Sequence, residues 1–216
     1  MQKQEDSLPE KRASRGDKAE DILNAASEVF IARGYAAARL DDIAARAGVA
    51  KGTLYLYFQS KEDIFQSLVR TAIVPNLAQL EAVTKAWDGP VAPLLERFAG
   101  IVLGVVGNDR LVAIPRLLLA EAKTFPDLAR FYHREVAHRG LGLLTNIIAK
   151  GVARGEFRAV DPLHAARLVV APFLFHALWQ SVFGDFDETP VDPAAFARTH
   201  LDVLLHGLRA EPGSSS

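Results

Sequence analysis

The sequence has no cysteine and a single methionine among its 216 residues. Without cysteine the chain has no disulfide, no zinc–thiolate site and no thiol nucleophile, and it suits a reducing compartment. No charge-free apolar run approaches the ~18 residues of a membrane-spanning helix. The N-terminal segment is polar and lacks the apolar core of a secretory signal. We therefore expect a cytoplasmic protein that does not enter a membrane.

The chain also lacks a strong charge of one sign, since 25 lysines and arginines face 26 aspartates and glutamates. Any binding of nucleic acid must then depend on local arrangement rather than on bulk charge. Four basic residues do gather before the first expected helix, namely Lys11, Arg12, Arg15 and Lys18. Such an arm can follow phosphates or enter a minor groove, or it can be a solvated tail. Both interpretations stay open.

Signatures of catalysis are missing from the sequence. It contains no glycine-rich phosphate loop and no GxSxG, and none of its six histidines shows the spacing that puts two metal ligands on one helix face. We therefore expect no enzyme, no cofactor and no metal site. A helical enzyme remains an alternative of another class.

Nearly all of the chain between the two polar ends has the pattern of α-helices. Alanine and leucine dominate, and no alternation typical of strands persists. We expect an all-α fold, with an N-terminal three-helix domain and a larger C-terminal helical domain. The expected divisions are a flexible basic arm over 1–16, a first domain over 17–70, a second over 71–209 and a disordered tail over 210–216.

Helix boundaries follow from caps, glycines and prolines. Asp17 and Gly34 bound the first expected helix, Gly48 follows the second, and Ser60 begins a long one that Pro75 kinks or ends. The expected helices lie at about 18–33, 40–47, 51–57, from 60 onward, 91–106, 110–123, 127–154, 162–183 and 193–209.

The segment from Arg39 to Phe58 fits the demands of a helix-turn-helix. Two helices that cross through a tight turn need a small residue at their contact and a glycine in the turn, which Ala44 and Gly48 provide. Five apolar positions fall where such a pair buries its side chains: Ile43, Ala47, Val49, Leu54 and Tyr57. An ordinary helical hairpin is the alternative, but the outward residues are short, polar and aromatic, unlike a solvated face rich in Glu and Lys.

At these residues the sequence resembles a known family. Gly34-Tyr35, the run from Leu40 to Ala44, the run from Ala47 to Phe58 and Ser60-Lys61-Glu62 are similar to the DNA-binding domain of the tetracycline-repressor (TetR) family. Its members are all-helical and usually dimeric. The resemblance implies three N-terminal helices that bind operator DNA and a larger domain that binds a small-molecule inducer. It also implies that the ligand releases the operator by changing the separation of the two reading heads.

The resemblance carries DNA-binding roles to particular positions, which face base edges or phosphates. The candidate DNA-binding residues are Arg39, Lys51, Thr53, Leu54, Tyr55, Tyr57 and Lys61. Lys61 begins the helix after the hairpin, where free N–H groups favour a phosphate. One position departs from the family, because Arg39 stands where a Ser or Thr usually caps the second helix. The cap hydroxyl is lost there, although an arginine can contact phosphate itself.

The second domain carries the expected ligand site and dimer interface. Aromatic residues, together with polar residues inside apolar stretches, are candidates to line an apolar pocket, with ordinary core as the alternative for each. These candidates are Phe98, Arg116, Phe125, Tyr132, Phe173, His176 and Trp179. The segments 162–183 and 193–209 carry more apolar surface than one small domain hides, which predicts a homodimer through them.

Together these patterns predict a transcriptional regulator, most simply a repressor that an apolar or aromatic small molecule releases from double-stranded operator DNA. A DNA-binding architectural protein without an effector is the alternative of another class. The long apolar C-terminal region favours the sensor.

Overall fold

The structure is a computed structural model that describes residues 15–106, 108–189 and 191–210. Most of the expected basic arm and of the expected tail lie outside the described residues. The α-helices are α1 (Arg15–Ala37), α2 (Leu40–Arg46), α3 (Lys51–Tyr55), α4 (Lys61–Ala72), α5 (Val74–Ala86), α6 (Ala92–Val106), α7 (Asp109–Glu121), α8 (Pro126–Tyr132), α9 (His138–Ala153), α10 (Pro162–Phe183) and α11 (Pro193–Leu208).

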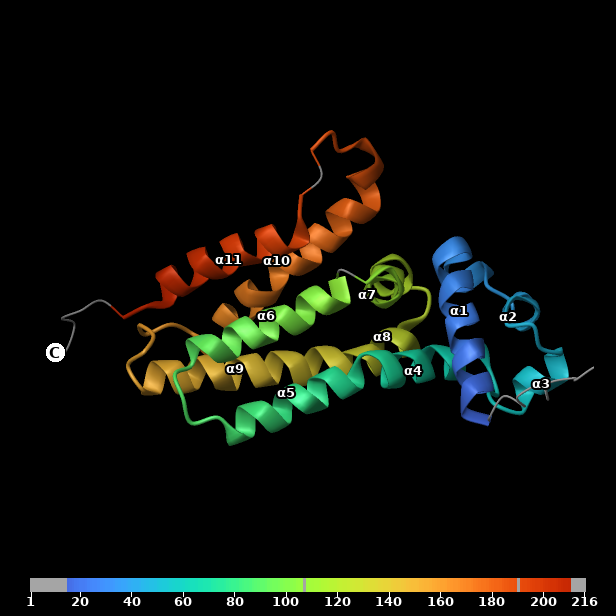
Figure 1. The fold of residues 1–216 in the computed structure, drawn as a ribbon, viewed down its shortest axis with the longest axis horizontal. Coiled ribbons are helices and arrows are strands. Elements are labelled where there is room, and N and C mark those ends of the chain that lie inside the picture. The colour runs from blue at the N-terminus through green and yellow to red at the C-terminus, as the bar shows by residue number, and fades with distance from the viewer. Residues whose placement is uncertain (1–14, 107, 190, 211–216) are drawn as a thin grey trace, which may run out of the picture.

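The molecule is elongated, with α1, α2 and α3 at one end (Figure 1). We call α1–α4 the N-terminal head and α5–α11 the C-terminal bundle. The α4 helix leads from the head directly into α5, while α7 and α8 pack against α1 and α4 respectively. Strands are absent from the described residues apart from one isolated antiparallel bridge between Phe157 and Arg209. The expected all-α class is confirmed.

Two large apolar clusters hold these parts together. The first joins the head to the bundle, since Phe30 and Phe65 of the head share it with Leu117 and Leu118 of α7 and with Phe131 of α8. The second lies inside the bundle and is built around Leu94, Leu144 and Ile148. The head therefore has no separate core, so that a shift of α7 or α8 acts directly on the packing of α1 and α4.

The helix boundaries correct several expectations. The α1 helix begins at Arg15 rather than Lys18, and it continues to Ala37 through a break at Gly34, where φ is 73° and ψ is 169°. The α4 helix ends at Ala72, and Pro75 lies in the first turn of a further helix, α5, which the sequence analysis did not separate. The region expected as one helix over 127–154 is α8, a π-helical turn over His133–Ala137, and α9.

The last two helices begin as their sequences predict. Asp161 and Asp192 each cap the helix that follows, with Pro162 and Pro193 in the first turn. In the part of the chain that the structure describes, no helix combines the length and the apolar character needed to cross a bilayer.

Candidate nucleic-acid interface

The α2–α3 hairpin has the tight crossing that the sequence predicts. Gly48 adopts a φ of 66°, a left-handed conformation that glycine accepts without strain. The backbone N–H of Val49 donates to the carbonyl of Ala44 at 3.0 Å, which closes the turn. Ile43 and Leu54 are fully buried beneath it. Helices this short have little stability of their own, so this burial is what fixes the direction of α3.

The outer face of α3 is open. Lys51 and Gly52 are exposed, Tyr55 is 47% exposed, and Leu56 is 73% exposed at the end of the helix. Thr53 and Tyr57 are partly exposed beside them. The expectation that Leu54 contacts DNA is wrong, because its side chain is 0% exposed and supports α3 from below. The open face thus combines hydroxyl donors, a cation and an apolar side chain able to meet a thymine methyl group.

Asp41 links the two cations on this face. Its carboxylate lies 2.7 Å from the Lys51 ammonium and 4.0 Å from the Arg39 guanidinium. The hydrogen bond from Lys51 lowers the pKa of Asp41 and raises the pKa of Lys51. Arg39 precedes α2 without a capping side-chain bond, as expected from the missing hydroxyl. A DNA phosphate would have to compete with Asp41 for both cations, a role that the sequence analysis missed.

Two ion pairs fix the hairpin on α1. Arg33 lies 2.6 Å from Asp42, and Arg46 lies 2.5 Å from Glu28. Each joins α1 to α2 across a partly exposed boundary, where such pairs contribute about 0–1 kcal/mol. They orient α2 more than they stabilise it.

Lys61 points back to the end of α1. Its ammonium donates to the carbonyls of Tyr35, Ala36 and Ala38 at 2.5, 3.2 and 2.9 Å, and it lies 4.4 Å from the centre of the Tyr35 ring. Burial lowers its pKa. All three donors of the ammonium are thus used within the protein, so Lys61 positions α1 against α4. Ser60 caps α4 as predicted, accepting from the N–H of Asp63.

Glu121, the last residue of α7, approaches the same end of α1 from the bundle. Its carboxylate accepts from the N–H of Tyr35 at 2.9 Å and from the N–H of Ala36 at 3.0 Å. A Cβ on Gly34 would lie 2.9 Å from the same carboxylate, so a side chain there would displace Glu121 from this contact. The sequence analysis did not single out Glu121, because nothing in the sequence of α7 shows that its end meets α1.

The predicted ligand residues do not meet in one place. Phe125 and Tyr132 pack against the cluster that joins head and bundle, where Phe125 contacts the Tyr35 ring at 4.9 Å. Phe98 belongs to the bundle core and Phe173 to a small cluster with Ala99 and Ala197. His176 lies beside Phe173, since both rings contact Phe196. The other two lie elsewhere: Trp179 is 41% exposed, and Arg116 lies on α7.

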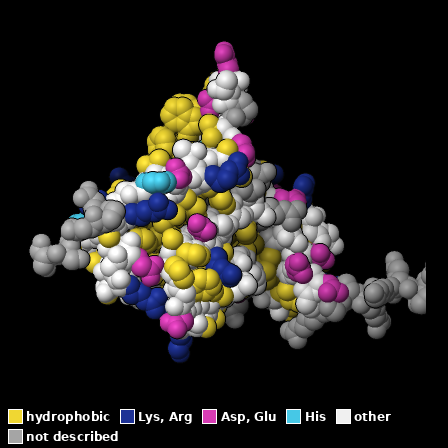
Figure 2. All heavy atoms as spheres, turned by 60° about the vertical axis from the view of Figure 1, so that its left-hand side comes forward, with side chains coloured by type: hydrophobic (Ala, Val, Ile, Leu, Met, Phe, Trp, Pro, Cys, Tyr) yellow, Lys and Arg dark blue, Asp and Glu magenta, His cyan; other side chains and the backbone are white. Residues whose placement is uncertain are grey.

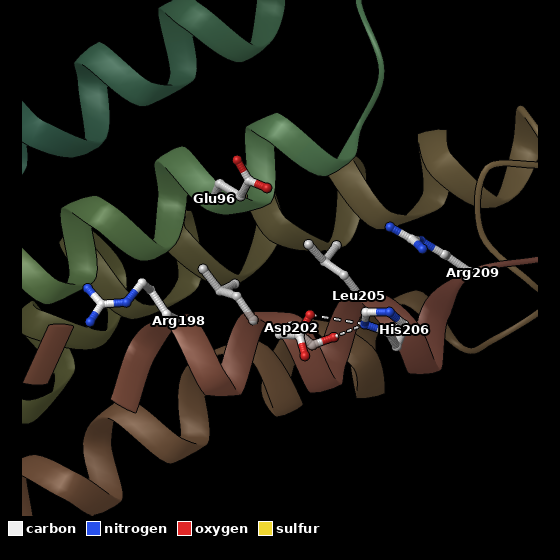
Figure 3. A pocket seen from close by; sticks show the side chains of 7 residues that line it. Glu96, Arg198, Asp202, Leu205, His206 and Arg209 are labelled. Carbon is white, nitrogen blue, oxygen red and sulfur yellow. Dashed lines mark hydrogen bonds and ion pairs between the residues drawn. The ribbon is translucent and has the colours of Figure 1, made fainter. Parts of the chain in front are cut away.

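Two grooves flank α11. One, of about 440 Å³, lies between α6 and α11 (Figure 3) and is lined by Glu96, Arg198, Leu201, Asp202, Leu205, His206 and Arg209. Asp202 and His206 pair with each other there. The other, of about 530 Å³, lies where the start of α10 meets α11 and includes Leu168, Val203 and Leu204. Both grooves are open to solvent, and the first mixes acids and bases.

A broad apolar surface follows α10. Its exposed large side chains are Leu163, Leu168, Leu174, Phe175, Leu178, Trp179, Val182 and Phe183, and Val203 of α11 is 66% exposed. Apolar atoms gather on the projecting part of the molecule in Figure 2. Phe186, three residues after the end of α10, is 81% exposed. Exposed apolar residues in this number are typical of an interaction surface.

The hairpin, its open outer face and the helical bundle behind it define a helix-turn-helix DNA-binding regulator. Comparisons with known proteins agree. Residues 22–68 match the family of bacterial regulatory proteins described as the tetR family. Residues 93–205 match the C-terminal domain of AefR-like transcriptional repressors. Because this second match covers more than half of the chain, the protein belongs to the TetR family of transcriptional regulators.

Individual relatives support the same assignment. The fatty acid metabolism regulator protein of Bacillus subtilis is 28% identical over 87% of this chain and 93% of the relative. The transcriptional repressor KstR2 of Mycolicibacterium smegmatis is 26% identical over 95% and 96%. A structure of the regulator FadR from Bacillus subtilis in complex with stearoyl-CoA has a TM-score of 0.73 at 24% identity, covering 88% of this chain and 99% of that one. FadR from Bacillus halodurans has a TM-score of 0.74 at 24% identity, covering 92% and 100%.

Proposed function

We propose that this protein is a homodimeric repressor that binds operator DNA with α3 of each protomer and is released by a long-chain acyl ligand. In this proposal residues 17–70 bind DNA, and residues 71–209 bind the effector and form the dimer. The observation that carries the proposal is the open face of α3, whose exposed residues are supported by a fully buried Leu54.

The DNA contacts follow from exposure. Thr53 and Tyr55 face the major groove from α3, and Tyr57 lies at its end. Lys51 and Arg39 give up their ion pairs with Asp41 and contact DNA phosphates instead. A phosphate competes well with a solvent-exposed carboxylate for a cation. Phosphate contacts set the register of the protein, and the side chains that reach base edges set the sequence preference.

The dimer follows from the apolar surface of α10 and α11. Two copies of this surface, related by a two-fold axis, would cover Phe175, Leu178 and Val203, which are otherwise exposed. A two-fold dimer presents two α3 helices, so the operator would have two half-sites in inverted orientation. Their spacing would be set by the dimer geometry.

The ligand class is supported by the relatives. One is a fatty acid metabolism regulator, and the structure with a TM-score of 0.73 holds stearoyl-CoA. The bundle is rich in apolar side chains, which suits a long hydrocarbon chain. Because the head shares its core with α7 and α8, an acyl chain that moves these helices would also move α1 and α4.

The test is fluorescence anisotropy of the full-length protein with a labelled duplex from the region upstream of its own gene, at two salt concentrations. Tyr55→Ala tests the open face, and Ile31→Ala, at an exposed apolar side chain of α1, is the matched control. We expect the protein and the control to prefer this duplex over scrambled DNA, with an affinity that falls as salt rises. We expect Tyr55→Ala to lose at least tenfold in affinity, and stearoyl-CoA, but not CoA alone, to release the duplex.

Each part of the proposal has its own contrary result. Equal binding to native and scrambled DNA would contradict a sequence-specific repressor and favour an architectural protein. Unchanged affinity in Tyr55→Ala would contradict the assigned face. Release by CoA alone, or no release by stearoyl-CoA, would contradict the acyl ligand and leave the DNA-binding role intact.

A further inference from the structure

Arg116 of the bundle lacks the hydrogen-bond partner that a buried arginine Nε normally has among the described residues. It lies in the middle of the apolar helix α7, directly after Pro115, and its Nε atom is buried without a hydrogen-bond partner. Among the described residues none forms an ion pair with its guanidinium. A guanidinium stays charged at all ordinary pH values, so a buried and unpaired Nε is costly to the fold unless something absent from the chain binds it.

Other partly buried arginines of the bundle do have acceptors. Arg139 makes two bonds to the carboxylate of Glu81, at 3.1 and 2.9 Å. Arg154 donates to the carbonyl of Gly89 and pairs with Asp88. These structural arginines hold two helices, or a helix and a loop, together. Among the residues that the structure describes, Arg116 has no such partner, which sets it apart as a candidate for binding.

The exposed fractions of its neighbours place Arg116 between a buried and an exposed part of α7. Ile114, Leu117 and Leu118 face the cluster shared with α1, so the 100° step per residue puts Arg116 on the opposite face with Val112 and Leu119. On that face Val112 is 1% exposed, while Leu119 is 63% exposed. Besides α1, α7 contacts α6 and α10, and Figure 1 shows it between these elements. Arg116, which is itself partly exposed, thus lies on the face of α7 between a buried and an exposed apolar residue.

We propose that Arg116 is the anion anchor of the effector site, and that it binds the carboxylate or phosphate group of an amphiphilic effector whose apolar part enters the bundle beside α7. This rests on the proposed function, which it deepens by naming the group that recognises the polar end of the ligand. A guanidinium binds either oxyanion through paired N–H donors, and the buried Nε is one of those donors. The groove of Figure 3 also holds Arg198 and Arg209, but it is open to solvent and shares them with the carboxylates of Glu96 and Asp202. Arg198 already lies 3.8 Å from Asp192, so this groove suits an anion anchor less well.

Arg116 lies on the same helix as a residue that contacts the DNA-binding head. Arg116 and Glu121 are five residues apart on α7, a rise of about 7.5 Å along one helix. Glu121 holds the end of α1 through Tyr35 and Ala36. An anion that draws Arg116 toward it therefore acts on the same helix that fixes α1. Pro115 also removes one helical hydrogen bond beside the anchor, so α7 can bend there.

The test compares Arg116→Met with Arg116→Lys and with Arg97→Met, which removes an exposed arginine of α6. Three probes are used on the full-length dimer bound to operator DNA: stearate, stearoyl-CoA and uncharged stearyl alcohol. Melting temperature without probe is measured for each variant. We expect Arg116→Met to bind operator normally and to melt no lower than the original protein, because an unpaired charge has been removed.

We further expect Arg116→Met to need at least tenfold more of an anionic probe for release, with the response to stearyl alcohol and the Arg97→Met control unchanged. Arg116→Lys should fall between, since it keeps the charge and loses the paired donors. If Arg116→Met weakens release by stearate alone, the bound group is a carboxylate. If it weakens release by stearoyl-CoA alone, the bound groups are the phosphates.

Three results would overturn the anchor. The first is release of Arg116→Met by both anionic probes at the original concentrations. The second is a lower melting temperature of Arg116→Met, which would make Arg116 a structural residue. The third is failure of both anionic probes on the original protein. If the original protein does not bind operator at all, it is the proposed function that fails.

Discussion

The carboxylate of Glu121 accepts hydrogen bonds from the backbone N–H groups of Tyr35 and Ala36, at 2.9 and 3.0 Å. Lys61 binds the carbonyls of Tyr35, Ala36 and Ala38 in the same turn. The end of α1 is therefore held by an acid from the bundle and a base from the head. These charges complement the free N–H and carbonyl groups of a broken helix end.

Replacing Glu121 with Ala should destabilise this junction. Two N–H groups would lose a charged acceptor, which costs about 1.5–3 kcal/mol of unfolding free energy. Urea denaturation at fixed protein concentration measures the change, with Glu96→Ala, an exposed acid of α6, as the matched control. A loss no larger than that of the control would show that the contact adds nothing to stability.

Gly34→Ala should lower the free energy of unfolding, both through backbone strain and through its approach to Glu121. At a φ of 73° and a ψ of 169°, a Cβ is strained by about 1–3 kcal/mol. The same Cβ would lie 2.9 Å from the Glu121 carboxylate. We therefore expect Gly34→Ala to cost less in a Glu121→Ala background than alone, by about 0.5 kcal/mol or more. The four proteins of this double-mutant cycle are compared by urea denaturation, and strict additivity would mean that only the backbone conformation matters.

Asp41→Asn should increase the affinity for DNA. The change removes a negative charge from the DNA-facing surface and frees Lys51, whose ammonium lies 2.7 Å from Asp41. We expect tighter binding to both native and scrambled duplexes. The slope of log affinity against log salt concentration should be steeper by up to about one unit. Anisotropy at several salt concentrations measures both, and Asp88→Asn, an exposed acid of the bundle, is the control. Weaker binding would instead mean that Asp41 holds Lys51 in the orientation that DNA requires.

The helix-turn-helix was predictable because its determinants are local. Ala44, Gly48 and Leu54 lie within eleven residues, and the crossing of α2 and α3 follows from their order alone. Lys61 was also visible as the first residue of a helix, and the resemblance together with that position predicted a phosphate contact. Its actual partners belong to the end of α1, and only the packing of α1 on α4 brings them within reach.

The effector region was harder to predict because residue type does not reveal its surroundings. Phe173 and Trp179 lie on the same apolar helix, yet the first is 1% exposed and the second 41%. An aromatic side chain serves equally well in a core, a pocket or a dimer interface. Arg116 stays a prediction, which rests on its being a lone charge in an apolar stretch of α7. The end of α4 and the start of α5 were missed since Pro75 is compatible with both a kink and a new helix.

Phe175→Glu should weaken the proposed dimer. The side chain is 61% exposed on α10, so a carboxylate there is tolerated in a monomer but would be buried in the two-fold interface. We expect dissociation to shift to at least tenfold higher protein concentration in sedimentation velocity, with operator affinity falling in parallel. Ile31→Glu, at an exposed apolar residue of α1, should leave the dimer intact. Unchanged association of Phe175→Glu would place the interface elsewhere.

Tyr35→Phe should change how stability responds to alkaline pH. Burial, with smaller contributions from Glu62 and Glu121, raises the pKa of Tyr35 to about 12. An unfolded tyrosine ionises near pH 10. The folded state therefore holds this proton more tightly, and the stability from Tyr35 is complete below pH 10 and is lost between about pH 10 and 12. Removing the phenol should make the fall of unfolding free energy across this interval shallower by roughly 1–2 kcal/mol.

Urea denaturation at pH 8, 10 and 11 measures the difference, and Tyr55→Phe, at an exposed phenol, is the control. Parallel curves for the original protein and Tyr35→Phe would mean that this phenol is already accessible to solvent when the end of α1 is held by Glu121 and Lys61.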